Sequence, residues 1–384
     1  MSATVTGAQR LCADPTLAGP GKPGLVTNFT GVLPDLTSTV DGLRAAGVPL
    51  AALFSPEHGI RGTVQAGYSE DETVDPASGL PVFDTYMKQG AALDELLVAS
   101  GVDTLLYDLQ DIGTRFYTYI WTMFDVMVSA ARTGKRFVVL DRPNPVGGAV
   151  AEGPGLSSAY ASFVGRVSIP VRHGMTVGEL ARFLNASAVP AEAGRPVDLS
   201  VVTLDGWRRD MTAADTGQPW VMPSPNIPTA DSALVYPGTG LFEGTNLSEG
   251  RGTTRPFELV GAPYLDARFV PALRGLDLPG TGFREVWFTP TFHKHAGTAL
   301  RGVQVHVTDA RAFEPVRTAV AMLGTLRELY PDGFGWRARE NADGFFIDLL
   351  WGDDDLRRAV DAGKDPLSLV PVRSAPSGDH LLYP

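Results

Sequence analysis

The stretch Val48-Pro49-Leu50-Ala51-Ala52-Leu53-Phe54-Ser55-Pro56-Glu57-His58-Gly59-Ile60-Arg61-Gly62 decides the fold. It begins as an apolar run, typical of a buried strand, and ends in an acid, an imidazole and an arginine held between glycines. Open α/β sheets present catalytic groups in loops at the carboxyl ends of their strands. The stretch therefore predicts a parallel α/β sheet with Glu57 and His58 at its functional edge.

Strands alternate with helices on both sides of this stretch. Further strands are expected at 24–28, 102–107 and 136–140, and helices at 38–46, 87–100 and 115–132. Ser38 and Thr114 are candidate caps for the first and the last of these helices. Alternation of this kind predicts a parallel, Rossmann-like sheet.

Polar side chains follow three of the expected strands. Glu57 and His58 come after one strand, Asp108 and Asp111 after the next, and the pair Asp141 and Asn144 after the last. The carboxyl ends of parallel strands lie along one edge of a sheet, so these three clusters are expected to converge there.

The middle of the chain is less regular. Strands are expected at 167–171 and 197–204, and a helix at 176–185, where Thr176 and Glu179 have the spacing of a capping box. A span rich in proline and glycine, 216–252, marks a change in composition. We therefore expect a Rossmann-like catalytic domain over residues 1–235.

A smaller α+β domain is expected over residues 236–384, closing the active-site cleft. Its expected elements are strands at 283–289 and 302–308, a helix at 314–330 and an apolar segment at 345–351. The fold class predicted for the whole chain is therefore α/β, with a Rossmann-like parallel sheet and a second, smaller α+β domain.

Composition excludes several classes of function. The 384 residues carry a formal net charge of −11, which argues against a nucleic-acid or anionic-membrane partner. Cys12 is the only cysteine, so neither an intrachain disulfide nor a cysteine zinc site is expected. Residues 1–24 do not have the pattern of a signal peptide, and no apolar run is long enough to span a membrane, so a cytoplasmic protein is expected.

Several nucleotide-binding and hydrolase motifs are absent, or are present without the structural context that they require. Gly19–Gly24 matches the dinucleotide-binding pattern, but it precedes a strand and contains prolines that lack the backbone donor for phosphate. Gly238–Gly244 is not followed by a Walker lysine, and no G-x-S-x-G elbow occurs. His293 and His295 share a face if they lie on a strand, but they are as readily surface residues. No cofactor and no metal are expected.

Glu57 is the leading catalytic candidate, as a proton donor or as a base, with His58 to orient it, hold substrate or act as a ligand. Asp108 and Asp111 offer a second carboxylate beside Arg115, although a turn acid and a helix-capping acid would have the same sequence. The loop 244–255 places Arg251 between glycines, where it can bind a carboxylate, although a solvated loop would also fit.

With these residues assembled, the chain resembles the exo-β-N-acetylmuramidase family typified by NamZ, formerly the domain-of-unknown-function family DUF1343. The resemblance extends almost from end to end and consists of several long blocks in the same order. These blocks are 25–28, 54–62, 108–119, 140–145, 172–176, 223–226, 242–253 and 381–383.

The resemblance implies an active site between a Rossmann-like domain and a smaller domain. It implies release of terminal N-acetylmuramic acid from the non-reducing end of peptidoglycan fragments, with Glu57 as the catalytic residue, muramyl saccharides as the partners and no cofactor. Many relatives are exported, whereas this sequence favours cytoplasmic cell-wall recycling. A non-catalytic protein that binds muropeptides or sugars is the alternative.

Glycoside cleavage needs an acid at the leaving oxygen and support for an oxocarbenium-like centre. Glu57 is the expected acid, and Asp108 or Asp111 is the expected second carboxylate, with Glu243 and Glu249 as outside candidates. The 2-acetamido group of the substrate is an alternative internal nucleophile. An arginine, Arg61, Arg115 or Arg251, is expected to bind the lactyl carboxylate. The full set of candidate substrate-binding residues is Arg61, Gln110, Arg115, Tyr117, Asn144, His173, Asn226, Glu243, Asn246, Glu249 and Arg251.

Overall fold

A six-stranded parallel sheet forms the centre of the first half of the chain. The computed structural model describes residues 3–65, 67–70, 73–340 and 342–384. The strand order is β3-β2-β1-β4-β5-β6, with every pairing parallel, as in a Rossmann fold. The strands are β1 (Pro23–Thr27), β2 (Ala52–Ser55), β3 (Val82–Asp84), β4 (Thr104–Asp108), β5 (Arg136–Leu140) and β6 (Asp198–Val202). The predicted fold class is confirmed.

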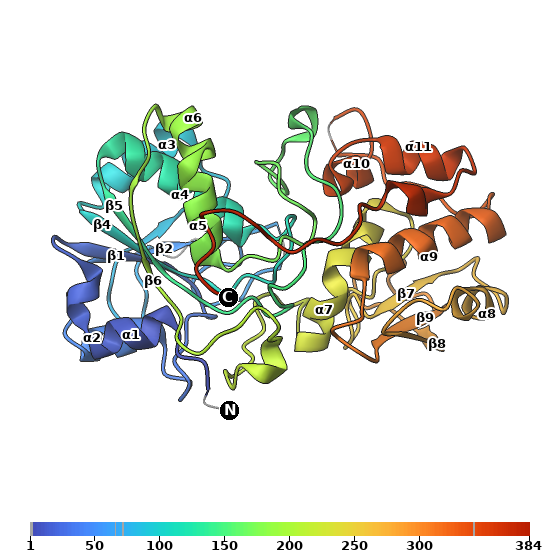
Figure 1. The fold of residues 1–384 in the computed structure, drawn as a ribbon, viewed down its shortest axis with the longest axis horizontal. Helices are drawn as coiled ribbons and strands as arrows, with labels where there is room; N and C mark the ends of the chain where they lie inside the picture. Colours follow the sequence, from blue (N-terminus) through green and yellow to red (C-terminus); the bar gives the residue numbers. More distant parts are fainter. Residues whose placement is uncertain (1–2, 66, 71–72, 341) are drawn as a thin grey trace.

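Helices cover both faces of this sheet, as Figure 1 shows. Successive strand residues point to opposite faces, so Leu25 and Leu53 pack in one core and Val26 and Phe54 in the other. On the first face lie α1 (Gly7–Ala13) and α2 (Thr39–Ala45); on the second lie α3 (Gly90–Ala99), α4 (Tyr119–Thr133), α5 (Val177–Ala186) and α6 (Ala188–Ala193). Ser38 caps α2 through the Asp41 amide, and Thr176 and Glu179 form the expected capping box of α5.

Two local predictions are wrong. Helix α4 has Thr118 rather than Thr114 at its N-cap position. The segment 167–171 is not a strand, because its Ile169 carbonyl accepts a hydrogen bond from the Arg115 guanidinium instead of a ladder partner. Just after this segment, Arg172 forms isolated β-bridges with Thr114 and with Glu152, which connect it to neighbouring loops.

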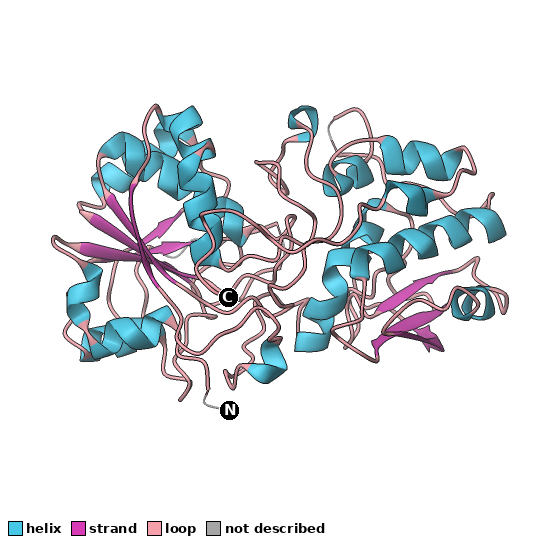
Figure 2. Cartoon of the chain, in the orientation of Figure 1, coloured by secondary structure: helices cyan, strands magenta, loops and turns pink. Residues whose placement is uncertain are grey.

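A three-stranded antiparallel sheet forms the smaller domain, in the order β7-β9-β8. Its strands are β7 (Leu259–Ala262), β8 (Thr281–Phe288) and β9 (Leu300–Val307), and its helices are α8 (Phe269–Arg274), α9 (Pro315–Leu329), α10 (Phe346–Trp351) and α11 (Asp355–Asp361). The strands predicted near β8 and β9 and the helix predicted near α9 are confirmed, whereas β7 was not predicted. Helix α7 (Ala230–Thr239) packs against α9, and the segments between the two sheets are largely loops (Figure 2).

The C-terminal tail, residues 374–384, returns to the parallel-sheet domain, as the red trace in Figure 1 shows. The Leu382 amide donates to Oε1 of Glu179 at 2.9 Å, and the Tyr383 hydroxyl hydrogen-bonds to Asp141. Burial raises the pKa of Asp141 to about 6, although the Tyr383 hydroxyl, the Gly178 amide and the Thr176 hydroxyl stabilise its charged form. Asp141 therefore anchors the tail and does not face a cavity lined by the other predicted acids.

Candidate active site

A large cavity lies beyond the carboxyl edge of the parallel sheet and is lined by both halves of the chain. Its volume is about 630 Å³, within the usual range of ligand sites. The first half contributes Glu57 and His58, and the second half contributes Glu243 and Arg251. The two halves therefore meet around this cavity with a carboxylate on each side, and it is called the main cavity below.

Glu57 enters the main cavity because the chain turns sharply after β2. His58 and Gly59 both have left-handed backbone angles, with φ of 72° and 73°, which directs the chain back into the loop that follows. A left-handed histidine is uncommon, and such residues gather at functional sites. The Glu57 side chain is only 8% exposed, so its contacts within the protein decide its chemistry.

Two donors hold the Glu57 carboxylate. The Gly67 amide donates to Oε1 at 2.6 Å, and the Thr118 hydroxyl hydrogen-bonds to Oε2. Each oxygen of Glu57 therefore accepts one hydrogen bond, and the two contacts hold the carboxyl group in one orientation at the cavity wall.

His58 secures the loop that supplies Gly67. Its backbone amide donates to the Tyr68 carbonyl at 2.9 Å, and its Nδ1 lies 3.0 Å from the Val64 carbonyl. A carbonyl only accepts, so Nδ1 carries a proton in this contact. His58 also lines the main cavity, so it both shapes the loop and presents its ring edge to a ligand.

Tyr86 follows β3 and lines the cavity beside Glu57. Burial and the charge of the neighbouring Glu57 raise the pKa of its phenol above the ordinary value. Tyr86 therefore stays protonated and is available as a neutral hydrogen-bond donor.

The opposite wall is built around Arg251. Its guanidinium lies 3.2 Å from Glu243 and 3.3 Å from Glu249, and it sits 5.0 Å above the centre of the Phe257 ring. Both carboxylates raise the pKa of Arg251 against the opposing effect of burial, so the guanidinium stays charged. Glu243 lines the cavity, whereas Glu249 is fully buried behind it.

Glu249 is the counter-charge for several cations. Besides Arg251, it contacts Nδ1 of His293 at 3.2 Å and Nζ of Lys294 at 2.8 Å. Burial disfavours its charge, but Lys294, the contact with His293 and Arg251 together outweigh burial and hold the pKa of Glu249 well below its usual range. Glu249 therefore organises the wall and has no oxygen in the cavity lining.

Buried aromatic rings form the floor of the main cavity. Tyr236 packs edge to face against Tyr117 at 6.0 Å and against Phe257 at 4.6 Å. Tyr117, Tyr236 and Phe257 are each no more than 7% exposed. Edge-to-face contacts of this kind fix ring positions, so the floor is preorganised for a ligand.

Asp108 and Asp111 do not line the main cavity. Asp108 is fully buried and forms a bidentate ion pair with Arg142, at 2.6 and 2.9 Å. Asp111 accepts hydrogen bonds from the Gly113 amide and from Nε2 of His173, at 2.7 and 3.0 Å. The Met175 amide donates to Nδ1 of His173, so Nε2 carries the proton that reaches Asp111.

Arg115, Asn144 and Asn246 lie in structural networks outside the cavity lining. Arg115 is fully buried and donates to four carbonyls, and burial lowers the pKa of its guanidinium to about 10. Asn144 bonds the Met175 carbonyl and the Val146 amide. Asn246 bonds the Gly333 carbonyl, the Gly335 amide and the Tyr264 hydroxyl.

Arg61 and Asn226 lie near the site without lining it. Arg61 points away and pairs with Asp75, bracing the loop that follows β2. Asn226 donates to Gln65, which does line the cavity, at 3.3 Å. His293 and His295 have different partners, Glu249 and the Asn246 carbonyl. Among the described residues no group of three or more acidic, histidine or cysteine side chains is arranged to hold a metal ion.

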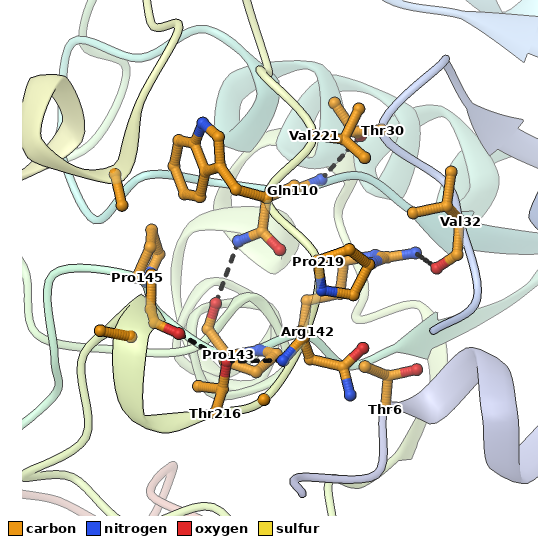
Figure 3. Close-up of a pocket in the computed structure, with 16 residues that line it drawn as sticks. Thr6, Thr30, Val32, Gln110, Arg142, Pro143, Pro145, Thr216, Pro219 and Val221 are labelled. Atoms are coloured by element: carbon orange, nitrogen blue, oxygen red, sulfur yellow. Dashed lines mark hydrogen bonds between the residues drawn. The ribbon is translucent and has the colours of Figure 1, made fainter. Parts of the chain in front are cut away.

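Gln110 lines a second, smaller cavity of about 220 Å³ at the point where the strand order reverses, between β1 and β4 (Figure 3). Gln110 donates to the Pro143 carbonyl at 3.0 Å, and Arg142 contributes its guanidinium to the wall. No aspartate or glutamate lines this cavity, because Asp108 lies behind Arg142. Of the two cavities, the main cavity is therefore the one with carboxylates in its lining.

Several lining residues carry no motif in the sequence. Thr118, Tyr86, Phe163, Arg337 and Phe346 all reach the main cavity. Thr118 lies within the block 108–119 but had no predicted role, and Phe346 lies in the apolar segment predicted at 345–351 without a predicted place in the site. Only their position in the fold identifies them.

Two models of one protein family match this chain, one over most of each half. The N-terminal model of the exo-β-N-acetylmuramidase NamZ matches residues 24–231, and the C-terminal model matches residues 234–372. The chain belongs to the NamZ family of exo-β-N-acetylmuramidases. The family expected from the sequence is thereby confirmed.

Individual members of the NamZ family agree with this assignment. The peptidoglycan β-N-acetylmuramidase NamZ of Bacillus subtilis (strain 168) is 47% identical over 349 residues, which are 90% of this chain and 81% of the relative. A crystal structure of a DUF1343 family protein from Bacteroides fragilis has a TM-score of 0.82 at 36% identity and covers 93% of this chain and 91% of its own. A second one has a TM-score of 0.73 at 28% identity and covers 96% and 93%.

The described residues include no helix long and apolar enough to cross a membrane.

Proposed function

We propose that the protein is a glycoside hydrolase that releases terminal N-acetylmuramic acid from the non-reducing end of peptidoglycan fragments. Membership of the NamZ family and the Bacillus subtilis relative support this reaction. The observation that carries the proposal is Glu57, a carboxyl group held by Gly67 and Thr118 at the wall of the main cavity.

Glu57 acts as the general acid. It transfers its proton to the glycosidic oxygen as the bond between that oxygen and the anomeric carbon breaks. Water then adds its oxygen to the anomeric carbon and gives up a proton to a carboxylate of the site, Glu57 if the configuration is retained or Glu243 if it is inverted. Tyr86, kept neutral beside Glu57, donates a hydrogen bond to the substrate or to the acid.

Glu243 is our candidate for the second carboxylate. It lines the same cavity on the far side from Glu57, whereas Asp108 and Asp111 are held by Arg142 and His173. Glu243 pairs with Arg251 at 3.2 Å, and a carboxylate at this place can stabilise an oxocarbenium-like centre. If the acetamido group of the substrate acts as nucleophile instead, Glu243 orients that group.

The lactyl carboxylate of the sugar binds beside Arg251. Of the three arginines considered for this role, only Arg251 lines the cavity. Arg337 and Arg339 line it as well, whereas Glu57, Glu243 and Glu340 supply acidic groups to the same lining. A guanidinium can bind a carboxylate through two parallel hydrogen bonds, so a single arginine is sufficient for this contact.

Product analysis on an N-acetylmuramic acid–N-acetylglucosamine disaccharide tests the proposal. The protein is expected to release the terminal muramic acid, and Glu57→Gln is expected to lower kcat by at least about 100-fold. Binding of the disaccharide without any product after long incubation would favour the alternative, a non-catalytic muropeptide-binding protein. Turnover by Glu57→Gln at the unmodified rate would remove Glu57 from the mechanism.

Two coarser proposals accompany this one. We propose a domain boundary near Tyr236, supported by the sheets: the parallel strands precede it and the antiparallel strands follow it. Limited proteolysis tests this boundary.

We also propose action on soluble fragments in the cytoplasm, supported by the acidic net charge, which disfavours anionic cell surfaces. Cell fractionation tests the location.

A further inference from the structure

Exposed aromatic rings gather at the mouth of the main cavity. Among the described residues the exposed aromatic side chains are Tyr68, Phe163, Phe292 and Trp287, at 67%, 41%, 40% and 64%. The first three line the main cavity, and Trp287 does not. We call Tyr68, Phe163 and Phe292 the aromatic rim. Exposed apolar side chains that cluster around a cavity mark a binding surface.

Three separate segments supply the aromatic rim, and each has a fixed backbone. The Tyr68 carbonyl accepts from the His58 amide at 2.9 Å. Phe163 lies in a turn closed by two hydrogen bonds between Ser162 and Gly165, at 2.7 and 3.1 Å. The Thr291 amide and hydroxyl, next to Phe292, both bond the Gly252 carbonyl at 2.9 Å. The backbone that carries each ring is therefore tied to the fold before any ligand arrives.

A second layer supports one of these rings. Phe346 of α10 stacks on Phe163, with ring centres 6.4 Å apart and planes inclined by 24°. The Arg337 guanidinium lies 5.3 Å from the centre of the Phe346 ring on the cavity side of the chain. Stacking and cation–π contacts of this kind stabilise ring positions beyond the effect of burial.

The aromatic rim lies farther from the protein interior than the catalytic carboxyl group. Glu57 is 8% exposed and the floor rings are no more than 7% exposed, whereas every ring of the rim is at least 40% exposed. An enzyme that removes a terminal sugar must admit that sugar first, so the sugar lies deepest. The acid contacts the bridging oxygen, and the next ring of the chain then lies between the acid and solvent.

On the basis of the proposed function, we propose that the aromatic rim is a subsite for the leaving sugar, the ring on the far side of the cleaved bond. The apolar C–H face of a β-linked N-acetylhexosamine stacks on Phe163 and Phe292, with Tyr68 covering its edge. The protein therefore recognises a disaccharide unit rather than the terminal sugar alone.

Binding to the Glu57→Gln protein tests the subsite without turnover. The ligands are methyl N-acetyl-β-muramide, which ends at the bridging oxygen, and the muramic acid–glucosamine disaccharide, each measured by calorimetry. The Glu57→Gln protein with its rim intact is expected to bind the disaccharide at least tenfold more tightly than the methyl glycoside. Phe163→Ala combined with Phe292→Ala is expected to weaken disaccharide binding by about tenfold, from the stacking energy of two rings, and to change methyl glycoside binding less than twofold.

Trp287→Ala is the matched control, because Trp287 is an exposed aromatic residue outside the cavity. It is expected to change neither affinity. Equal loss of both ligands in the rim variant, or an unchanged preference for the disaccharide, would overturn the subsite. In the catalytically active protein, the rim variant must also lower kcat/KM for the disaccharide more than kcat/KM for the methyl glycoside. An equal fall for both substrates would overturn the subsite. Failure of the proposed function is distinct, since it appears as absence of disaccharide cleavage by the unmodified protein.

Discussion

The side-chain hydroxyl of Thr118 hydrogen-bonds to Oε2 of Glu57, although Thr118 occupies the N-cap position of α4. A threonine at this position ordinarily accepts a hydrogen bond from an amide of the first turn, and Thr118 makes no such bond. The hydroxyl is used to hold the carboxyl group instead. The first-turn amides of α4 therefore lack a hydrogen bond from a capping side chain, and the Glu57 side chain is held in one orientation instead.

Thr118→Val is expected to lower kcat by about 10- to 100-fold, because a hydrogen bond to a charged group contributes about 1.5–3 kcal/mol. Thr118→Ser keeps the hydroxyl and is expected to stay within about fivefold of the parent. Steady-state kinetics on the disaccharide measure both. The melting temperature of Thr118→Val should change little, since no cap bond is lost; a large fall in melting temperature at unchanged kcat would refute the assignment.

The two glutamates around Arg251 are expected to respond differently to amide substitution. Glu243→Gln should lower kcat by about 100-fold with a change in unfolding free energy below about 1 kcal/mol, because Glu243 lines the cavity. Glu249→Gln should destabilise the protein by about 3–5 kcal/mol, because it leaves Lys294 and Arg251 without their buried counter-charge. Urea unfolding and kinetics on both variants separate the roles, and the reverse pattern would make Glu249 the catalytic group.

Glu152 predicts a pH dependence of stability. Burial raises the pKa of Glu152 to about 7 from 4.5, although the Arg317 amide of α9 and the charge of Arg172 favour its ionised form. Folding therefore favours the protonated acid. The contribution of Glu152 to stability is complete below about pH 4.5 and is lost as pH rises through about 7.

Glu152→Gln keeps a neutral side chain at every pH, so it should remove part of the stability loss between pH 5 and pH 8. The expected difference is about 2–3 kcal/mol in the change of unfolding free energy over that interval. Urea titrations at the two pH values measure it, with Glu340→Gln as the control at a glutamate that is 78% exposed. An identical pH dependence in Glu152→Gln and the parent would contradict the prediction.

Arg115 joins four carbonyls from separate parts of the chain, those of Pro154, Ile169, Leu350 and Trp351. Arg115→Lys cannot span them, so it is expected to reduce the unfolding free energy by about 3 kcal/mol. Arg61→Lys is the control, because the Arg61 pair is partly exposed and should cost less than about 1 kcal/mol. A rise in KM at unchanged stability would instead make Arg115 a substrate ligand.

Five of the six parallel strands could be predicted because they are short apolar runs that alternate with helices, whereas the three-residue edge strand β3 was missed. Glu57 could be predicted as well, since a strand end followed by glycines places a side chain at the sheet edge. Asp108 shows where this reasoning stops. Its partner Arg142 is far along the chain, and only the folded structure shows that the ion pair removes the acid from the cavity.

The walls of the main cavity were less accessible to sequence reasoning for a similar reason. Phe163, Phe292 and Phe346 come from loops and a short helix with no period or motif, and each is ordinary until the fold brings them together. The predicted strand at 167–171 failed because a buried arginine, rather than a neighbouring strand, satisfies its backbone. When a side chain from elsewhere in the chain bonds the backbone in place of a neighbouring strand, the local sequence has no pattern that reveals it.

The return of the C-terminal tail sets the order in which the protein can be completed during synthesis. Glu179 and Asp141, in the parallel-sheet domain, take partners from Leu382 and Tyr383. These partners leave the ribosome roughly 10 to 40 s after β6 at ordinary rates of translation. In that interval Asp141 and Glu179 have only their partners within the parallel-sheet domain, such as Thr176 and Arg209, and the antiparallel domain must be synthesised before the tail can complete their contacts.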